Sequence, residues 1–255
     1  MVNHYSNLEI AKINQSGKIL SRVLREVVRA AKPGISTYAL DRLARKKIAA
    51  AGALPAFLGY QTHGSPPYPA ALCVSVNEEL VHCIPKKAKI VKPGDIVSLD
   101  LGVNYGGFFS DMAVTVPVGS VSSLAQRLIQ ATAAGLEEAI MIIKPGATLG
   151  DLGAAIQHAA ASKGFAVVRD LVGHGVGKTV HEDPKVPNYG TQGTGLRLTP
   201  GMVLAIEPMF TAGSHKIQML ADRWGIATAD GSLCAHFEKT VAVTQMGHKV
   251  LTPDF

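Results

Sequence analysis

The chain has 255 residues, 47% of them hydrophobic, and a formal net charge of +6 at pH 7. This length is enough to bury a sizeable core in one domain or two closely packed ones. The polar first residues and the lack of an apolar run of about 18 residues predict neither a signal peptide nor a membrane span, and three scattered cysteines argue against a disulfide framework, so we expect a cytoplasmic protein.

The first half of the chain predicts two helices and then strands. Apolar residues recur at helical spacing over residues 8–31. A Pro-Gly turn at residues 33–34 follows, and the alanine-rich segment after it predicts a second helix that ends at Gly52. Another Pro-Gly turn, at residues 93–94, opens an apolar strand that carries Asp100.

The second half repeats this order. Residues 121–143 again have apolar residues at helical spacing, and a Pro-Gly turn at residues 145–146 leads into another alanine-rich helix that ends at Gly164. A fourth Pro-Gly turn, at residues 200–201, opens an apolar strand that carries Glu207. The chain therefore contains an internal duplication.

Each half also brings a second acid at the start of a strand-like run, Asp111 in the first half and Glu238 in the second. The repeated order predicts a pseudo-symmetric α+β fold in which helices cover one face of a curved antiparallel sheet. We expect a single catalytic domain, residues 1–255, built of two related halves at about residues 1–118 and 119–255, with the four acids where the halves meet.

Four carboxylates at one interface could not all stay ionised without added positive charge, because like charges a few ångströms apart repel strongly in a partly dry site. A single strand-borne aspartate is more often an ordinary turn or surface acid. Asp100 and Glu207, however, lie inside apolar strands, where an unpaired acid is costly to bury. Divalent cations are the simplest source of the missing charge.

A glycine-rich segment at residues 173–184 adds two histidines, His174 and His181. Either one alone is more often a loop histidine bonded to the backbone, but together with the acids they suit Mn, Fe, Co or Zn. The segment differs from the helical His-Glu-x-x-His zinc motif, because the histidines lie seven residues apart and Pro184 would end a helix.

These residues resemble the type I methionine aminopeptidases, which have the creatinase-like pita-bread fold, from about residue 5 to residue 250. The resemblance rests on five ordered ligands and on two motifs, Asn77-Glu78…His82-x-Ile84-Pro85 and Gly-His-Gly-x-Gly…His-Glu-x-Pro. It implies that a water activated by two divalent metal ions attacks the first peptide bond and releases the initiator methionine from new proteins. The five ligands are Asp100, Asp111, His174, Glu207 and Glu238.

The resemblance also implies a role for each ligand. Asp111 and Glu238 would bridge the two metals, which Co, Mn, Fe or Zn could provide. His174 and Glu207 would complete the first metal site, and Asp100 would chelate the second. Glu207 would in addition act as the general base.

Five further residues are expected at the substrate by the same resemblance. His181 would hydrogen-bond the substrate carbonyl or oxyanion, and His82 would contact the scissile amide nitrogen. Tyr68, Cys73 and Trp224 hold positions that resemble the lining of the methionine pocket, where soft apolar groups suit a thioether, although such residues are as often plain core.

Five residues depart from the family pattern. His236 replaces the usual glutamine, and strand period two points it to the face of Glu238, where a titratable side chain would shift the pH dependence of activity. The other departures are Lys239 in place of the usual histidine, together with Cys83, Val180 and Ser110.

Two rival interpretations remain. A proline-specific relative on the same fold, a prolidase or an Xaa-Pro aminopeptidase, carries a similar ligand set, but these enzymes usually need a preceding domain, for which the first repeat leaves no room. A non-catalytic relative that binds nascent chains or RNA should have lost ligands, whereas all five are present.

The expected partners follow from the same resemblance and from the charge. The substrates would be nascent N-termini with methionine followed by a small residue. The basic charge favours an anionic partner such as the ribosome surface, although solubility explains it about as well. We expect a monomer with no membrane contact.

Overall fold

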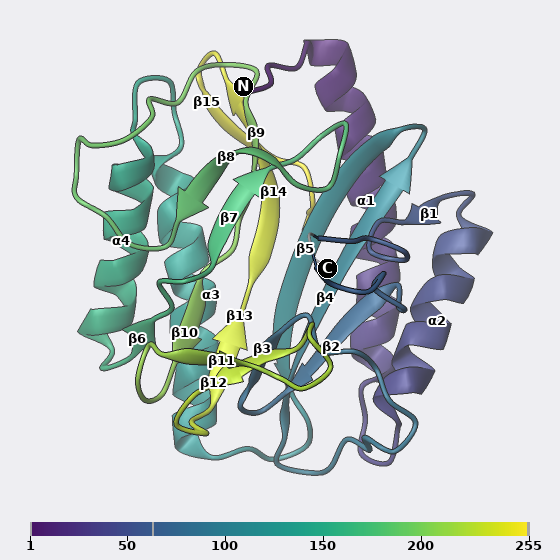
Figure 1. Cartoon of the computed structure of the whole chain (residues 1–255). Helices are drawn as coiled ribbons and strands as arrows, with labels where there is room; N and C mark the ends of the chain where they lie inside the picture. Colours follow the sequence, from purple (N-terminus) through teal and green to yellow (C-terminus); the bar gives the residue numbers. More distant parts are fainter. Residues whose placement is uncertain (1, 63, 254–255) are drawn as a thin grey trace.

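The computed structural model describes residues 2–62 and 64–253. In this part of the chain, nine strands form one curved antiparallel sheet: β1 (Leu54–Pro55), β2 (Leu72–Val76), β4 (Ile96–Tyr105), β5 (Phe108–Pro117), β7 (Val172–Gly175), β8 (Glu182–Pro187), β9 (Val203–Ile206), β14 (Glu238–Thr244) and β15 (Gly247–Val250). The order is β1-β4-β5-β14-β9-β7-β8, with β2 on β4 and β15 on β14 (Figure 1). The predicted curved antiparallel sheet is thus confirmed.

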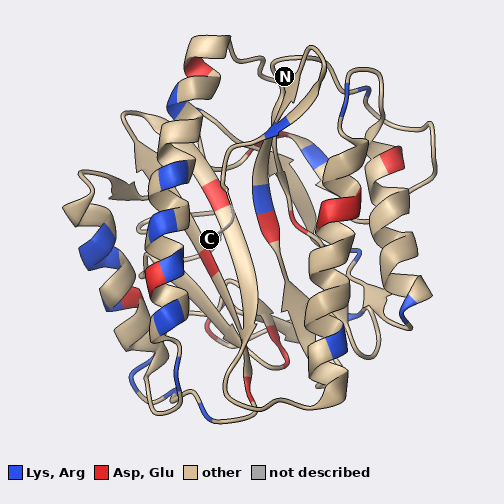
Figure 2. Cartoon of the chain, turned by 180° about the vertical axis from the view of Figure 1, so that it is seen from behind, with Lys and Arg blue, Asp and Glu red and all other residues tan. Residues whose placement is uncertain are grey.

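Helices cover one face of this sheet, two over each half, as seen from behind in Figure 2. They are α1 (Asn7–Ala30), α2 (Thr37–Ala50), α3 (Ser123–Ile142) and α4 (Leu149–Ser162). Each begins at a hydroxyl side chain that accepts a hydrogen bond from the backbone N–H three residues further on, which satisfies an otherwise unpaired donor. These caps are Ser6, Ser36, Ser122 and Thr148. The four predicted helices are therefore confirmed.

The duplication is visible in the backbone. The bridge between Ser36 and Ile90 in the first half recurs as the bridge between Thr148 and Arg197 in the second. The glycines of the four Pro-Gly turns all have φ values from 88° to 96°, in the left-handed region that glycine enters without strain. The local geometry of these turns is therefore the same at matching places in the sequence.

The two halves join at a short seam between β5 and β14. Two register pairs define it among the described residues, Ala113 with Glu238 and Met112 with Lys239. A second link is a small sheet in which β3 (Glu79–Val81) of the first half pairs with β12 (Ile226–Thr228) of the second. The remaining strands are β11 (Ile217–Met219), which joins β12, and a third sheet of β13 (Cys234–His236), β10 (Met209–Thr211) and β6 (Ala166–Val167).

Each half has its own apolar core between its helices and the sheet. Leu20, Leu24 and Leu99 lie at the centre of the first core, and Leu136 and Phe210 lie in the second. These cores leave the opposite face of the sheet free to carry polar side chains. Among the described residues, no helix has the length and apolarity needed to cross a membrane.

Candidate active site

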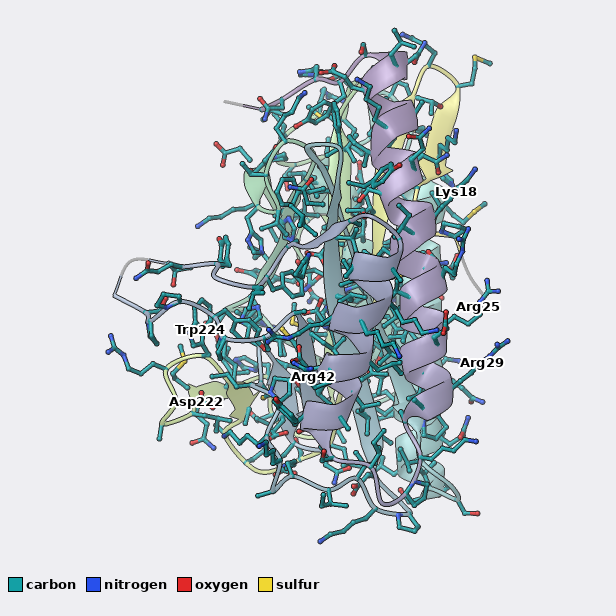
Figure 3. The ribbon with its side chains drawn as sticks, turned by 90° about the vertical axis from the view of Figure 1, so that its right-hand side faces the viewer. Lys18, Arg25, Arg29, Arg42, Asp222 and Trp224 are labelled. Atoms are coloured by element: carbon teal, nitrogen blue, oxygen red, sulfur yellow. The ribbon has the colours of Figure 1, made fainter. Side chains whose placement is uncertain are left out.

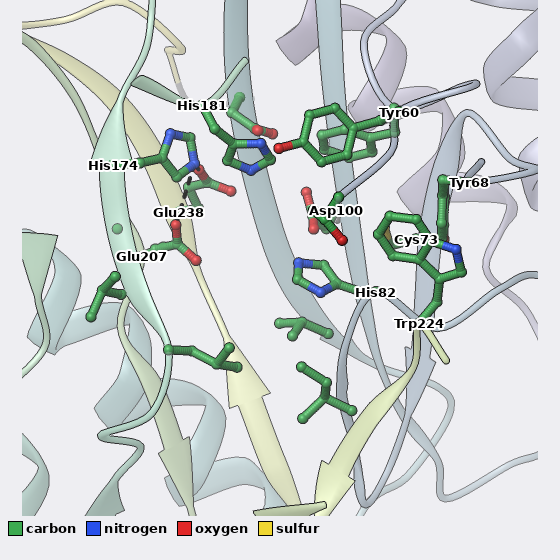
Figure 4. Close-up of a pocket in the computed structure, with 18 of the residues that line it drawn as sticks. Tyr60, Tyr68, Cys73, His82, Asp100, His174, His181, Glu207, Trp224 and Glu238 are labelled. Atoms are coloured by element: carbon green, nitrogen blue, oxygen red, sulfur yellow. Dashed lines mark ion pairs between the residues drawn. The ribbon is translucent and has the colours of Figure 1, made fainter. Parts of the chain in front are cut away.

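A pocket of about 640 Å³ is lined by residues of both halves and lies on the face of the sheet away from the helices. Figure 4 shows the side chains that converge on it. All ten residues that the sequence singled out for the site line this pocket: Tyr68, Cys73, His82, Asp100, Asp111, His174, His181, Glu207, Trp224 and Glu238.

Strand register explains why the acids share one face. Asp100 on β4 and Glu238 on β14 both pair with Ala113 on β5, so the three residues form a row across neighbouring strands. Residues directly opposite each other project to the same side of a sheet. Asp111 lies two residues before Ala113 and therefore projects to that side as well.

The second half adds two more groups by the same rule. His174 on β7 pairs with Ala205 on β9. Glu207 lies two residues after Ala205, so it shares the face of His174. The pairing of Lys239 with Ile206 places Glu207 beside Glu238, the residue before Lys239. The register thus gathers a histidine and four carboxylates from β4, β5, β14 and β7 and from the end of β9.

Close backbone packing around His174 requires its two neighbouring glycines. A Cβ atom on Gly173 would collide with the carbonyl oxygen of Ala205, and one on Gly175 would collide with the carbonyl oxygen of Asp183. The His174 ring is held by its Nδ1, which donates to the carbonyl oxygen of Gly175 at 2.9 Å. This leaves Nε2 of His174 directed toward the acids.

The carboxylates are buried with too little compensating charge. Burial, followed by repulsion from neighbouring acids, raises the pKa of Asp111 and Glu238 well above the ordinary values. Burial likewise raises the pKa of Asp100 to about 7 and that of Glu207 well above its usual range. Oδ1 of Asp100 and Oε1 of Glu238 have no hydrogen-bond partner among the described residues. Such a set of acids is stable only when cations or protons are bound to it.

The donor atoms fit divalent metal ions. His174, Glu207 and Glu238 form one group with ligand atoms within 4.8 Å of one another, and Asp100, Asp111 and Glu238 form a second. A third group joins Asp111 and His174 to His181. Nε2 of His174 lies 3.4 Å from Oε1 of Glu207 and 3.9 Å from Oε1 of Glu238. Imidazole with carboxylate ligands suits first-row transition metals.

Two further histidines lie beside these acids. His82 follows β3 and has a φ of 57°, a left-handed conformation that is strained for a residue with a side chain. Burial lowers its pKa to about 4. The ring of His181 lies 4.4 Å from that of His174 between centroids. Desolvation, followed by the neighbouring imidazoles, lowers the pKa of His181. Both rings are therefore neutral near pH 7.

An apolar subsite lies next to the acids. Tyr68 and Trp224 meet edge to face, with ring centroids 5.2 Å apart, and Cys73 packs in the same cluster. Nε1 of Trp224 donates to the carbonyl oxygen of Pro66 at 2.9 Å, and the Tyr68 hydroxyl donates to that of Cys83 at 3.1 Å. Because these polar groups are satisfied outside the cavity, the surfaces that face it are apolar.

Sequence reasoning missed Tyr60. This ring lines the pocket and lies 4.9 Å from the ring of His181 and 6.5 Å from that of Trp224, between centroids. Tyr60 stands in an irregular segment between β1 and β2. Such a segment has no periodicity from which its direction could be inferred, and an aromatic residue within it was the only signal.

The side chains of three residues that depart from the family pattern project to different places. Nε2 of buried His236 lies 3.7 Å from Oε2 of Glu207, so it does share the face of the acids. Burial lowers its pKa to about 3, so the ring is neutral near pH 7, and the expected effect of His236 on the pH dependence of activity stays a prediction. Lys239 projects to the other side, where Nζ donates to Oε1 of Glu137 at 2.6 Å. Ser110 contacts Ser16 at 2.9 Å between Oγ atoms, toward α1.

Comparisons with known proteins identify the family of this chain. The model of metallopeptidase family M24 matches residues 11–245. The chain is 44% identical to methionine aminopeptidase 1 of Bacillus subtilis over 96% of both chains, and 46% identical to the methionine aminopeptidase of Aquifex aeolicus over 97% of both. It superposes on the whole methionine aminopeptidase of Thermotoga maritima with a TM-score of 0.96 and 44% identity.

The proline-specific enzymes are more distant. The prolidase of Pyrococcus horikoshii matches with a TM-score of 0.77 and 23% identity, and the chain covers 64% of it. That likeness concerns the pita-bread fold alone. Family model, sequence identity and site geometry agree, and the chain therefore belongs to metallopeptidase family M24 and, within it, to the methionine aminopeptidases.

Proposed function

We propose that this chain removes the N-terminal methionine from newly made proteins by hydrolysis of their first peptide bond. The observation that carries this proposal is the register of β4, β5, β14, β9 and β7, which brings three buried acids, the partly buried Glu207 and a histidine beside an apolar subsite. One catalytic unit with two related halves, residues 1–255, accounts for a site to which both halves contribute.

Two divalent ions are the proposed cofactors, and Mn, Fe, Co and Zn all suit the donor set. His174, Glu207 and Glu238 would hold one of them, and Asp100, Asp111 and Glu238 the other. Glu238 belongs to both groups, which supports a bridging role for it. When bound, such ions supply Lewis acidity and lower the pKa of a water molecule.

The protein's own groups would then handle protons and orientation. Glu207 accepts the proton of the attacking water, because its carboxylate faces the space between the two halves. Neutral His181 donates a hydrogen bond to the carbonyl oxygen as negative charge develops there. His82, near Asp100 and the apolar subsite in Figure 4, donates to the leaving amide nitrogen.

The apolar subsite of Tyr68, Cys73 and Trp224 is proposed to hold the methionine side chain. A thioether packs well against aromatic rings and sulfur. The cluster adjoins Asp100, since Cys73 pairs with Asp100 across β2 and β4. A methionine bound there would place its amino group and first peptide bond next to the acids.

The proposed setting is the cytoplasm, where the chain would act as a monomer without membrane contact. The three cysteines are free and buried, as suits a reducing compartment. The proposed partner is the anionic surface of the ribosome. Lys18, Arg22, Arg25 and Arg29 follow one another at spacings of three and four residues, so they lie on one face of α1. The labelled members project away from the sheet in Figure 3.

The proposed activity is tested by treating the protein with EDTA, adding back Mn, Fe, Co or Zn separately, and measuring free methionine from Met-Gly-Met. An Xaa-Pro peptide is the matched substrate. We expect metal-restored cleavage of Met-Gly-Met and little cleavage of the Xaa-Pro peptide. Preference for the Xaa-Pro bond would establish a proline-specific enzyme, and inactivity with every metal would indicate a binding protein.

The proposed ribosome contact is tested separately by cosedimentation with ribosomes at two salt concentrations. Reversing the charges of Lys18, Arg22 and Arg29 should weaken binding and reduce its salt dependence, because each lost phosphate contact lowers the salt slope by about one. Peptide cleavage should stay at its original rate. Unchanged cosedimentation of the charge-reversed protein would contradict this docking face.

A further inference from the structure

His236 is an anomaly in the pocket region. Its side chain is buried, yet neither Nδ1 nor Nε2 has a hydrogen-bond partner among the described residues. A neutral imidazole carries one N–H donor and one acceptor nitrogen. Burying both without partners is costly, and an unsatisfied buried group in a folded protein calls for a specific explanation.

The carboxylate of Glu207 stands between two imidazoles. Oε1 of Glu207 lies 3.4 Å from Nε2 of His174, and Oε2 lies 3.7 Å from Nε2 of His236. His174 belongs to two of the three groups of residues that could hold a metal ion, whereas His236 belongs to none of those found among the described residues. His174 could therefore bind a metal ion together with Glu207, whereas His236 lies beside the Glu207 carboxylate.

We propose that His236 positions Glu207 by donating its Nε2–H to Oε2 of that carboxylate. This inference rests on the proposed function, in which Glu207 is both a ligand and the general base. Oε1 then stays on the side of His174, together with which it could hold a cation, while Oε2 is fixed by His236. The present separation of 3.7 Å closes by less than 1 Å when the bond forms, as hydrogen bonds in free enzymes often do in the loaded state.

Hydrogen bonds hold the main chain around His236 in place, so the position from which its ring can donate to the Glu207 carboxylate is fixed. The backbone N–H of His236 donates to Oγ1 of Thr115 at 2.9 Å, and the hydroxyl of Thr115 donates to the backbone carbonyl oxygen of His236 at 2.8 Å. On the other side, His236 pairs with Met209 across β13 and β10. Glu207 is anchored as well, since its carbonyl oxygen accepts from Nδ2 of Asn188 at 3.0 Å.

This arrangement explains how a carboxylate at the end of β9 keeps one orientation. A group that orients a metal-binding carboxylate contributes to metal affinity without touching the ion. His236 is thus a positioning residue and not a ligand. Its contribution depends on the N–H donor, and the bulk of the ring alone would not provide it.

The test compares His236→Leu, which has no donor, with His236→Gln, which keeps an N–H. His248→Leu is the matched control, because His248 is half-buried outside the pocket and its Nδ1 contacts the carbonyl oxygen of Ile143 at 3.1 Å. Mn²⁺ affinity of the EDTA-treated proteins is measured by calorimetry, and the visible spectrum of the Co²⁺-loaded proteins reports ligand geometry. Thermal melting of the metal-free proteins reports folding.

We expect His236→Leu to lower Mn²⁺ affinity by about 10- to 100-fold and to change the Co²⁺ spectrum. His236→Gln should stay within about 3-fold of the original affinity and His248→Leu should match it, since positioning requires only a donor at residue 236. On Met-Gly-Met, kcat should fall more in His236→Leu than KM rises. If His236→Leu does not fold, His236→Met replaces it as the variant without a donor.

Original Mn²⁺ affinity in a folded variant without a donor would overturn the inference. Equal losses in His236→Gln and His236→Leu would overturn it as well, because the donor would then be irrelevant. These outcomes differ from failure of the proposed function. In that case the unmodified protein itself would bind no Mn²⁺ or release no methionine.

Discussion

Two cavities lie on opposite sides of the seam between β5 and β14. They differ in whether the charged side chains that line them are paired within the chain. Glu238 and Lys239 are consecutive on β14, so they project to opposite faces of the sheet. The front pocket gathers acids around Glu238. A rear cavity of about 230 Å³, lined by α3 and the back of the sheet, contains Lys239. There the ammonium group is paired with Glu137 within the chain.

The difference shows which charges the chain neutralises for itself. The rear ion pair joins β14 to α3 and needs nothing from outside. The front acids have unpartnered oxygens and raised pKa values, so they are costly until a cation binds. The acids that the chain does not pair for itself therefore lie on the side of the seam where we expect the metal ions to bind.

Glu238→Gln is expected to have the largest effect on this comparison, because Glu238 belongs to two of the three groups that could hold a metal, including both groups proposed to hold the two ions. Residues that only orient ligands cost about 10- to 100-fold in affinity when changed, so loss of a shared ligand should exceed about 100-fold. Methionine release should fall to background. Calorimetry with Mn²⁺ and the Met-Gly-Met assay measure the two effects.

The same substitution should stabilise the metal-free protein at pH 8, since it removes an acid whose pKa is raised by burial and by the neighbouring acids. A gain of about 1 kcal/mol would raise Tm by roughly 2–4 °C for a chain of this size. A lower Tm in the metal-free variant would mean that Glu238 is paired in a way not seen here and would weaken the contrast between the two sides.

A smaller effect is expected from Asp100→Asn. Asp100 belongs to one group only, so the group of His174, Glu207 and Glu238 stays intact. The number of Mn²⁺ ions bound per chain should fall from the proposed two to one, and the metal that remains should bind within about 10-fold of its original affinity. Metal analysis after gel filtration measures the ratio. Loss of both ions, or retention of both, would disprove two separable sites.

The pH dependence of metal binding follows from the acids. In the metal-free protein the pKa of Asp100 is raised from 3.8 to about 7, and those of Asp111, Glu207 and Glu238 are also raised. At a pH between the ordinary pKa of an acid and its raised pKa in the folded state, the folded protein holds a proton that the unfolded chain has released. The stability that these bound protons provide is therefore lost as pH rises toward 7. A cation must displace those protons.

We therefore expect Mn²⁺ to release protons at pH 6 and its stabilising effect to shrink as pH falls from 7 to 5. His174 contributes little to this release, because burial already lowers its pKa to about 4. Calorimetry in two buffers with different ionisation enthalpies counts the protons. Binding at pH 6 without proton release would show that the acids are ionised before the metal arrives.

The smallest effect is expected behind the seam. Lys239→Met replaces a buried charge with an apolar side chain of similar length, while Glu137 is 56% exposed and can be solvated. The substitution therefore leaves no buried unpaired charge, and an ion pair with an exposed member contributes little to stability. We expect a change in unfolding free energy of at most about 1 kcal/mol. Metal affinity should stay unchanged, and a large loss would connect the two sides of the seam.

Much of the architecture could be predicted, because it rests on local and repeated patterns. Helical periodicity and the four Pro-Gly turns define the helices and the duplication. The face on which Asp100, Asp111 and Glu238 lie follows from period two once the strands are known. The site residues thus came together as expected from the sequence.

What escaped prediction depends on contacts between distant segments. Tyr60 reaches the pocket from an irregular segment whose course no sequence period describes. The pairing of β3 with β12 joins residues far apart in the chain, and the partner of Lys239 lies on α3. The ordinary pKa of His236 suggested a titrating group, but its burial could not be read from the sequence.

The seam between the halves has a mechanical consequence. Two register pairs join β5 to β14, whereas Asp100 and Asp111 from one half and Glu238 from the other could hold the same cation. A bound ion would therefore link the two halves directly and strengthen their contact. Backbone amides of β5 and β14 should then exchange with deuterium more slowly in the loaded protein, and removal of the metal would loosen the molecule along this line first.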